Sequence, residues 1–267
     1  MSQARFSVRS AVAEGFEFWR ANVLRAIGPL VIASVGLVVL LTARALPLLI
    51  AGFAVYVLAG LAAQGALYRI SLAGTGAESP DRNGPFGLQW RMTETRFAIV
   101  GLLATALLAI VVIIAVFMIS ALLVGLVGVP AATAATTPEM LLASLSPTGA
   151  FLFNAAALVA VAGLLVLNAR LSMAVPATAA ENRVRFLSSL GLTRGSVLRI
   201  LAATILINLP IIIMQSLAGL FGKAMHGADA VALTQLIVGI VSTFFYVPIS
   251  VGMTSYIYRR LREGTGQ

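Results

Sequence analysis

The sequence contains no cysteine, a single histidine and very little charge. Its 267 residues include 18 Lys and Arg but only 9 Asp and Glu, and charged residues make up 10% of the chain, against about 25% in soluble domains. The lack of cysteine excludes disulfides, thiolate catalysis, zinc–thiolate sites and iron–sulfur clusters. One histidine, His226, is too few for a haem pair or a histidine-based metal cluster. So few charges cannot solvate a globular surface of this size, which excludes a soluble enzyme domain, a disordered chain and a nucleic-acid module.

Long apolar runs take the place of the missing charge, and hydrophobic residues make up 60% of the chain. A helix needs about 20 apolar residues to cross a bilayer. The runs do not alternate in polarity, as strands of a membrane barrel would. We therefore predict an all-α integral membrane helical bundle with six transmembrane helices. The six charge-free windows are 26–43, 45–68, 97–138, 140–169, 200–222 and 230–258.

The third window is too long for one span, and its tail is small, polar and broken by Pro130. We expect its helix to end near Gly128, which leaves about 48 Å of helix at 1.5 Å per residue. A short interfacial helix is expected to follow from Thr137, an N-cap residue with proline after it.

The basic residues predict the orientation of the six spans. Sixteen of the 18 basic residues fall in segments that a six-span topology places on one side, and only Arg44 and Lys223 fall on the other. The positive-inside rule then puts both termini in the cytoplasm. Residues 1–24 carry apolar side chains at helical spacing and are predicted to form a cytoplasmic amphipathic helix.

A local pattern precedes each odd-numbered span: two Arg five residues apart, with an N-cap type of residue two positions after the first. It divides the single membrane domain 1–267 into three hairpin repeats, each with a preceding amphipathic helix, at 25–74, 84–180 and 181–262. A true threefold duplication and the common need for Arg at cytoplasmic corners both account for this pattern. The residues in it are Arg20, Asn22 and Arg25; Arg91, Thr93 and Arg96; and Arg194, Ser196 and Arg199.

The stretch 170–201 resembles a bacterial family of multi-pass proteins, the glycerophosphodiester phosphodiesterase membrane domain and the related YciC-type inner-membrane proteins. The resemblance rests on Arg170-Leu171-Ser172-Met173-Ala174-Val175-Pro176, on Glu181, and on Leu190-Gly191-Leu192-Thr193-Arg194-Gly195 with Arg199. It implies a six-helix, non-catalytic module of the bacterial inner membrane. The enzymatic half is not implied, because the chain lacks the acidic and histidine residues of metal-assisted phosphodiester hydrolysis.

Polar residues within the spans give little sign of chemistry. None of the nine acidic residues lies in the middle of a span, which argues against proton or sodium coupling. Asn208, just before Pro210, suggests either a polar site between spans 4 and 5 or an interhelical hydrogen bond worth about 1 kcal/mol or less. We therefore expect no catalytic residues, no metal and no cofactor.

The Arg pairs are the candidate binding residues, because guanidinium groups match phosphate in a bidentate way and helix N-termini favour anions. They suggest either a lipid-binding or a purely topogenic role for Arg20, Arg25, Arg91, Arg96, Arg194 and Arg199. We expect a non-enzymatic inner-membrane protein that engages anionic lipids and a partner membrane protein, in an accessory or assembly role, without nucleic acid. The alternative is a transporter of a small molecule or lipid.

Overall fold

The computed structural model describes residues 6–73, 85–127, 140, 143–187, 189–224 and 228–265, and these residues form helices and connections without a strand. The chain is a multi-pass all-α membrane protein, which confirms the predicted fold class. Six helical segments are long and apolar enough to cross a membrane: Val8–Thr42, Leu46–Ser71, Met92–Leu126, Pro147–Glu181, Val197–Leu217 and Leu233–Gly264.

The chain divides into two compact units, and the second consists of Leu102–Ala169 alone. The division falls inside the predicted second hairpin, 84–180, and not at its ends. The bounds 1–24, 25–74 and 181–262 of the other predicted segments stay predictions.

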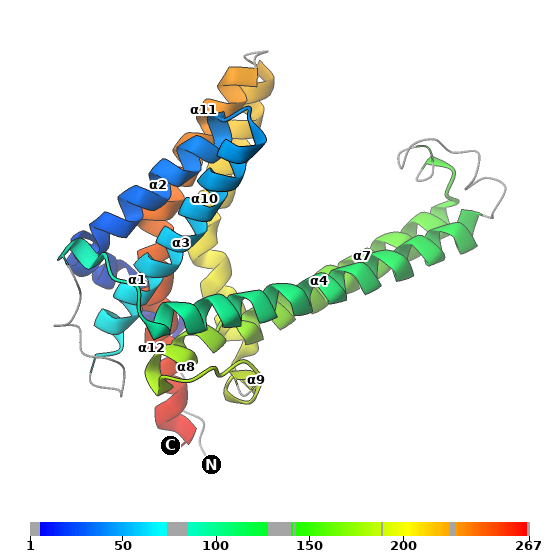
Figure 1. Cartoon of the computed structure of the whole chain (residues 1–267). Helices are drawn as coiled ribbons and strands as arrows, with labels where there is room; N and C mark the ends of the chain where they lie inside the picture. The colour runs from blue at the N-terminus through cyan, green and yellow to red at the C-terminus, as the bar shows by residue number, and fades with distance from the viewer. Residues whose placement is uncertain are drawn as a thin grey trace. The chain divides into compact units, whose positions relative to one another are not determined.

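The first unit contains Met1–Gly101 and Arg170–Gln267. Its α-helices are labelled in Figure 1. The elements are α1 (Val8–Asn22), η1 (Val23–Ala26), α2 (Ile27–Thr42), α3 (Leu46–Ser71), η3 (Pro85–Gly87), α8 (Ala174–Glu181), α9 (Ser189–Leu192), α10 (Val197–Ala224), α11 (Ala228–Val241), the π turn η4 (Ser242–Tyr246) and α12 (Val247–Thr265), together with the start of α4 (Met92–Val127) and the end of α7 (Pro147–Leu171).

Helices α2 and α3 form a hairpin that is closed by small residues. A Cβ added to Gly36 would lie 2.6 Å from the backbone nitrogen of Tyr56, and one added to Gly52 would lie 2.7 Å from that of Leu40. Two backbones come this close only where no side chain stands between them. The many glycines of the sequence therefore serve helix packing here.

Helix α1 packs against α12 rather than standing alone. Its buried residues are Ala11 and Gly15, and a Cβ on Gly15 would lie 2.7 Å from the carbonyl oxygen of Ile249. The apolar stripe predicted for the N-terminal helix is offset from this contact, and its Phe16 is 44% exposed. The smallest residues occupy the contact because they allow the closest approach to α12.

The predicted N-cap residues do not all precede a long helix. Ser196 stands directly before α10, but Thr93 is the second residue of α4. Asn22 is the last residue of α1, and its side-chain amide donates to the carbonyl oxygen of Phe18, 3.2 Å away. Asn22 directly precedes η1 but forms no side-chain cap bond there, and Thr93 lies inside α4 with its hydroxyl unbonded among the described residues, so neither residue caps a long helix with its side chain.

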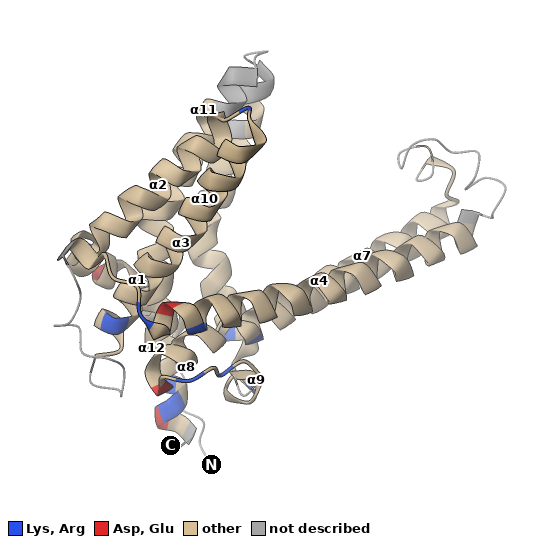
Figure 2. Cartoon of the chain, viewed as in Figure 1, with Lys and Arg blue, Asp and Glu red and all other residues tan. Residues whose placement is uncertain are grey.

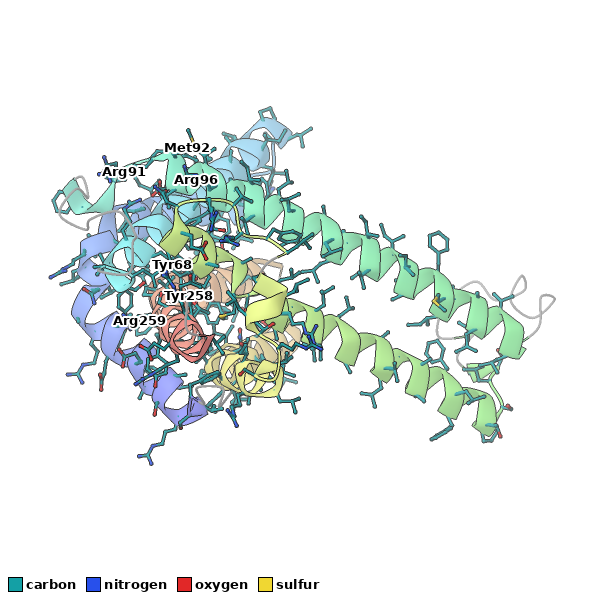
Figure 3. All side chains as sticks on the ribbon, turned by 90° about the horizontal axis from the view of Figure 1, so that it is seen from below. Tyr68, Arg91, Met92, Arg96, Tyr258 and Arg259 are labelled. Carbon is teal, nitrogen blue, oxygen red and sulfur yellow. The ribbon has the colours of Figure 1, made fainter. Side chains whose placement is uncertain are left out.

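The second unit contains most of α4 and α7, whose ribbons run alongside each other in opposite directions in Figures 1 and 3. Both helices expose large apolar side chains, including Phe117, Met118 and Phe151. The 36 residues of α4 extend about 54 Å, longer than the ~30 Å hydrocarbon core. The short helix predicted from Thr137 lies outside the described residues.

Candidate functional site

Charged residues of the first unit gather at the end where α8, α9 and the last turns of α12 lie (Figure 2). The stretches 27–42, 46–68 and 200–222 carry no charged residue. Arg44 lies in the turn between α2 and α3, at the other end of these helices from Arg69. The first unit is therefore an apolar bundle with one strongly charged end.

A fully buried ion pair joins two helices at this charged end. Arg69, in the last turn of α3, donates through Nη1 to Oε1 of Glu94 in the first turn of α4, and their side chains are 2% and 0% exposed. Removing one partner of such a pair costs about 3–5 kcal/mol, because it leaves an uncompensated buried charge. The pair thus fixes the end of α3 to the start of α4.

Two local features of the sequence place the Glu94 carboxylate. Its Oε2 accepts a hydrogen bond from the backbone N–H of Arg91, 2.8 Å away, which is the acidic half of a capping box. Gly65, one turn before Arg69, leaves the space that the carboxylate occupies, since a Cβ there would lie 2.7 Å from Glu94 Cδ. The Glu94 carboxylate therefore caps the N-terminus of α4 and also neutralises the charge of Arg69 on α3.

Helices α3 and α12 meet beside this pair through hydroxyl groups. The Tyr68 hydroxyl lies 3.0 Å from Thr254 Oγ1, and Ser71 Oγ lies 2.7 Å from Ser255 Oγ. Arg259 Nη1 donates to the carbonyl oxygen of Ser71, 2.9 Å away. Figure 3 shows Tyr68 and Arg259 close together at this end. The polar layer satisfies the buried hydroxyls and fixes the register of the two helices.

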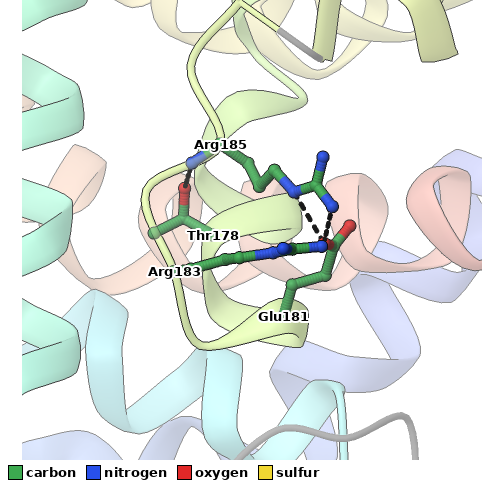
Figure 4. Close-up of polar contacts among 4 residues, drawn as sticks. All are labelled: Thr178, Glu181, Arg183 and Arg185. Carbon is green, nitrogen blue, oxygen red and sulfur yellow. Dashed lines mark hydrogen bonds and ion pairs between the residues drawn. The ribbon is translucent and has the colours of Figure 1, made fainter.

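The segment after α8 forms a second charged cluster (Figure 4). Glu181 Oε2 accepts from Arg183 Nη2 at 3.0 Å and from Arg185 Nε at 2.6 Å. The backbone N–H of Arg185 donates to Thr178 Oγ1, 3.1 Å away, which folds the segment back onto α8. Two guanidinium groups share one carboxylate, so this cluster keeps a formal charge of +1.

Two of the predicted binding residues, Arg91 and Arg96, interact within the protein. Arg96 Nη1 donates to Oδ1 of Asn182, the residue that ends α8 in a left-handed conformation with φ 53°. Arg91 Nη2 donates to Oε1 of Gln89 at 2.9 Å. Both side chains remain partly exposed. Neither of these two contacts is with a carboxylate.

The other four predicted binding residues lie on the surface of the same unit. Arg20, Arg25 and Arg194 are exposed, and Arg199 is partly exposed. In the part of the chain that the structure describes, no carboxylate forms an ion pair with Arg20, Arg25 or Arg199. The charged end therefore combines arginines neutralised by acids with arginines that face outward.

The Arg69–Glu94 pair was missed by the sequence analysis, which counted Arg69 only as a topogenic charge. The signal for Glu94 was its position three residues after Arg91 at the start of an apolar run, where a capping acid is expected. Gly65 one turn before Arg69 was a second signal, since it leaves room beside the guanidinium.

Asn208 forms one of the two interactions that the sequence suggested. Its Nδ2 donates to the carbonyl oxygen of Thr204 at 2.7 Å and to the hydroxyl of Tyr246 at 3.3 Å. The second bond joins α10 to η4 and is an interhelical hydrogen bond.

Among the described residues, no group of His, Asp and Glu side chains has the arrangement of a metal site. The single histidine, His226, lies outside the described residues. The candidate site therefore consists of the buried Arg69–Glu94 ion pair and the outward-facing arginines of the charged end.

Comparison with known proteins adds no relative. No family model, no curated protein and no solved structure matches this chain. The resemblance of the stretch 170–201 to the phosphodiesterase membrane domain stays an expectation from its motif.

Proposed function

We propose that this multi-pass membrane protein is a non-enzymatic module of the bacterial inner membrane whose charged end binds anionic lipid headgroups on the cytoplasmic side. The proposal rests on one observation: Arg20, Arg25 and Arg199 face outward at that end and form no ion pair with a described carboxylate. Guanidinium groups bind phosphate through two parallel hydrogen bonds. The net charge of +9 supports the same partner, because cytoplasmic leaflets carry negative lipid.

Three other arginines are paired with acidic side chains and are left out of the proposed lipid-binding set. Arg69, Arg183 and Arg185 are paired with Glu94 and Glu181. These three arginines form ion pairs within the protein, so we propose that they stabilise the bundle and do not bind a ligand. Separating paired from outward-facing arginines narrows the lipid-binding proposal to the second group. An accessory or assembly role beside a partner membrane protein is part of the same proposal.

The test is lipid retention after extraction in a mild detergent, measured by native mass spectrometry. The double variants Arg20→Gln/Arg25→Gln and Arg194→Gln/Arg199→Gln should each bind phosphatidylglycerol about thirtyfold more weakly, because each charge near a membrane surface contributes about 1 kcal/mol. Lysine at the same positions should keep bulk attraction and lose bidentate geometry. The control is Arg44→Gln, which removes a charge at the opposite end and should leave retention unchanged. Equal retention in all variants would refute the proposal and leave only the topogenic role.

A further inference from the structure

Two departures from regular α-helix lie next to each other in the first unit. Pro210 stands inside α10, where it supplies no N–H to the helix. The π turn η4 separates α11 from α12. The Asn208–Tyr246 hydrogen bond ties the two irregular turns together. Single π turns inside helices are frequent at functional sites.

The turns border an apolar hollow of about 170 Å³ between α1, α10 and η4. Its walls include Phe16, Ile207, Ile211, Met214 and Phe245. Phe16 and Phe245 are each 44% exposed, so the hollow reaches the surface of the bundle. Water is held in a cavity only where polar groups can bond it. These walls therefore suit a hydrocarbon chain.

A positive charge lies one helical turn from a wall residue of this hollow. Arg20 follows Phe16 by one helical turn on the same face of α1, about 6 Å along the axis, and its side chain is exposed. Trp19 holds this turn of α1 in place: its ring lies 4.8 Å from that of Phe245, and its Nε1 donates to the carbonyl oxygen of Phe244 at 3.0 Å. An apolar slot and an outward-facing guanidinium are thus fixed relative to each other.

We propose that this hollow holds one acyl chain of an anionic glycerophospholipid whose phosphate is bound by Arg20. Lipid surrounds a bundle that crosses a membrane, so an acyl chain is the hydrocarbon available to enter. The guanidinium complements a phosphate and gives neutral lipids no ionic partner. This inference rests on the proposed lipid-binding function. It adds the hollow as the site of the acyl chain and Arg20 as the residue that binds the phosphate.

Trp19 provides a built-in reporter of the site. The chain has two tryptophans, and the exposed Trp90 can be replaced by phenylalanine to leave Trp19 as the only one. The protein is reconstituted in phosphatidylcholine bilayers that contain increasing fractions of phosphatidylglycerol with brominated acyl chains. Brominated phosphatidylcholine serves in a parallel series. Bromine quenches tryptophan fluorescence over short range, so quenching reports a chain beside Trp19.

We expect half-quenching at a several-fold lower fraction of phosphatidylglycerol than of phosphatidylcholine. Arg20→Gln, a surface change that leaves the walls intact, should reduce this preference about fivefold. Ile211→Phe fills the hollow and should abolish the preference. Ile213→Phe makes the same change two residues further on, at a side chain that is 50% exposed and lies outside the hollow, and should preserve it.

The outcomes separate the site from the broader function. A preference for phosphatidylglycerol that survives Ile211→Phe, or that Arg20→Gln leaves unchanged, would overturn the site and leave anionic-lipid binding standing. Identical quenching by the two lipids in the parent protein would overturn the site, and the lipid-retention measurement on the double Arg variants would then decide the broader function separately.

Discussion

Glu94→Gln tests whether the buried ion pair holds the first unit together. The substitution preserves the shape of the side chain and removes its charge, so the 2%-exposed Arg69 loses its counter-ion. A buried charge left without its partner costs about 3–5 kcal/mol. That magnitude corresponds to a shift of more than a hundredfold in the folding equilibrium.

The measurement is equilibrium unfolding of the purified protein in mixed micelles with increasing SDS, followed by circular dichroism. The double variant Arg69→Met/Glu94→Leu removes both charges and should recover most of the loss, because well-packed apolar residues replace buried pairs at little cost. Thr93→Val is the matched control on the adjacent residue. The Thr93 hydroxyl is buried without a hydrogen-bond partner among the described residues, so its removal should be neutral or slightly stabilising.

Two results would refute the reasoning. One is a Glu94→Gln variant within about 0.5 kcal/mol of the parent, the range of an ordinary surface substitution. The other is a double variant less stable than Glu94→Gln alone, which would mean that the site depends on polarity and not on charge balance.

Two further predictions concern packing and topology. Gly36→Ala should destabilise the protein by about 1–3 kcal/mol, because its Cβ would lie 2.6 Å from the Tyr56 nitrogen, whereas Gly60→Ala, with open space around the new Cβ, should be neutral or stabilising in the same SDS titration. Single cysteines should report orientation cleanly in this cysteine-free chain: Ala228→Cys should react with an impermeant maleimide from outside and Gly266→Cys only after permeabilisation, and the reverse pattern would contradict cytoplasmic termini.

The sequence predicts the helices well where hydropathy alone decides their bounds. The first two charge-free windows, 26–43 and 45–68, lie within a few residues of α2 and α3. The sixth window predicts one regular helix, but the π turn η4 interrupts it. Pro248, two residues after the turn, is a local mark that the hydropathy window passes over: it supplies no N–H to the carbonyl oxygen of Phe244, which accepts from Trp19 Nε1 instead.

The candidate site was less predictable because its contacts join distant parts of the chain. Arg69 and Glu94 are 25 residues apart. Both lie outside the charge-free windows, where a charged residue is expected simply to belong to a turn between two spans. The face that α1 buries also depends on a distant partner: close contact with α12 requires Gly15, which hydrophobic periodicity does not single out. Arg20 faces outward although Glu17 lies three residues before it, and the sequence alone does not decide between an ion pair and an outward-facing charge at this spacing.

The pairing of α1 with α12 has a consequence for synthesis of the protein. Trp19 and the carbonyl of Phe244 that it binds are separated by 225 residues. At about 5–20 residues per second, a ribosome that has made Trp19 needs roughly 10–45 s more to deliver its partner. During that interval the small-residue face of α1, centred on Gly15, has no α12 to cover it. Chains that stall before the last helix would therefore display a docking face that finished chains conceal, which is the kind of surface that membrane chaperones and proteases can recognise.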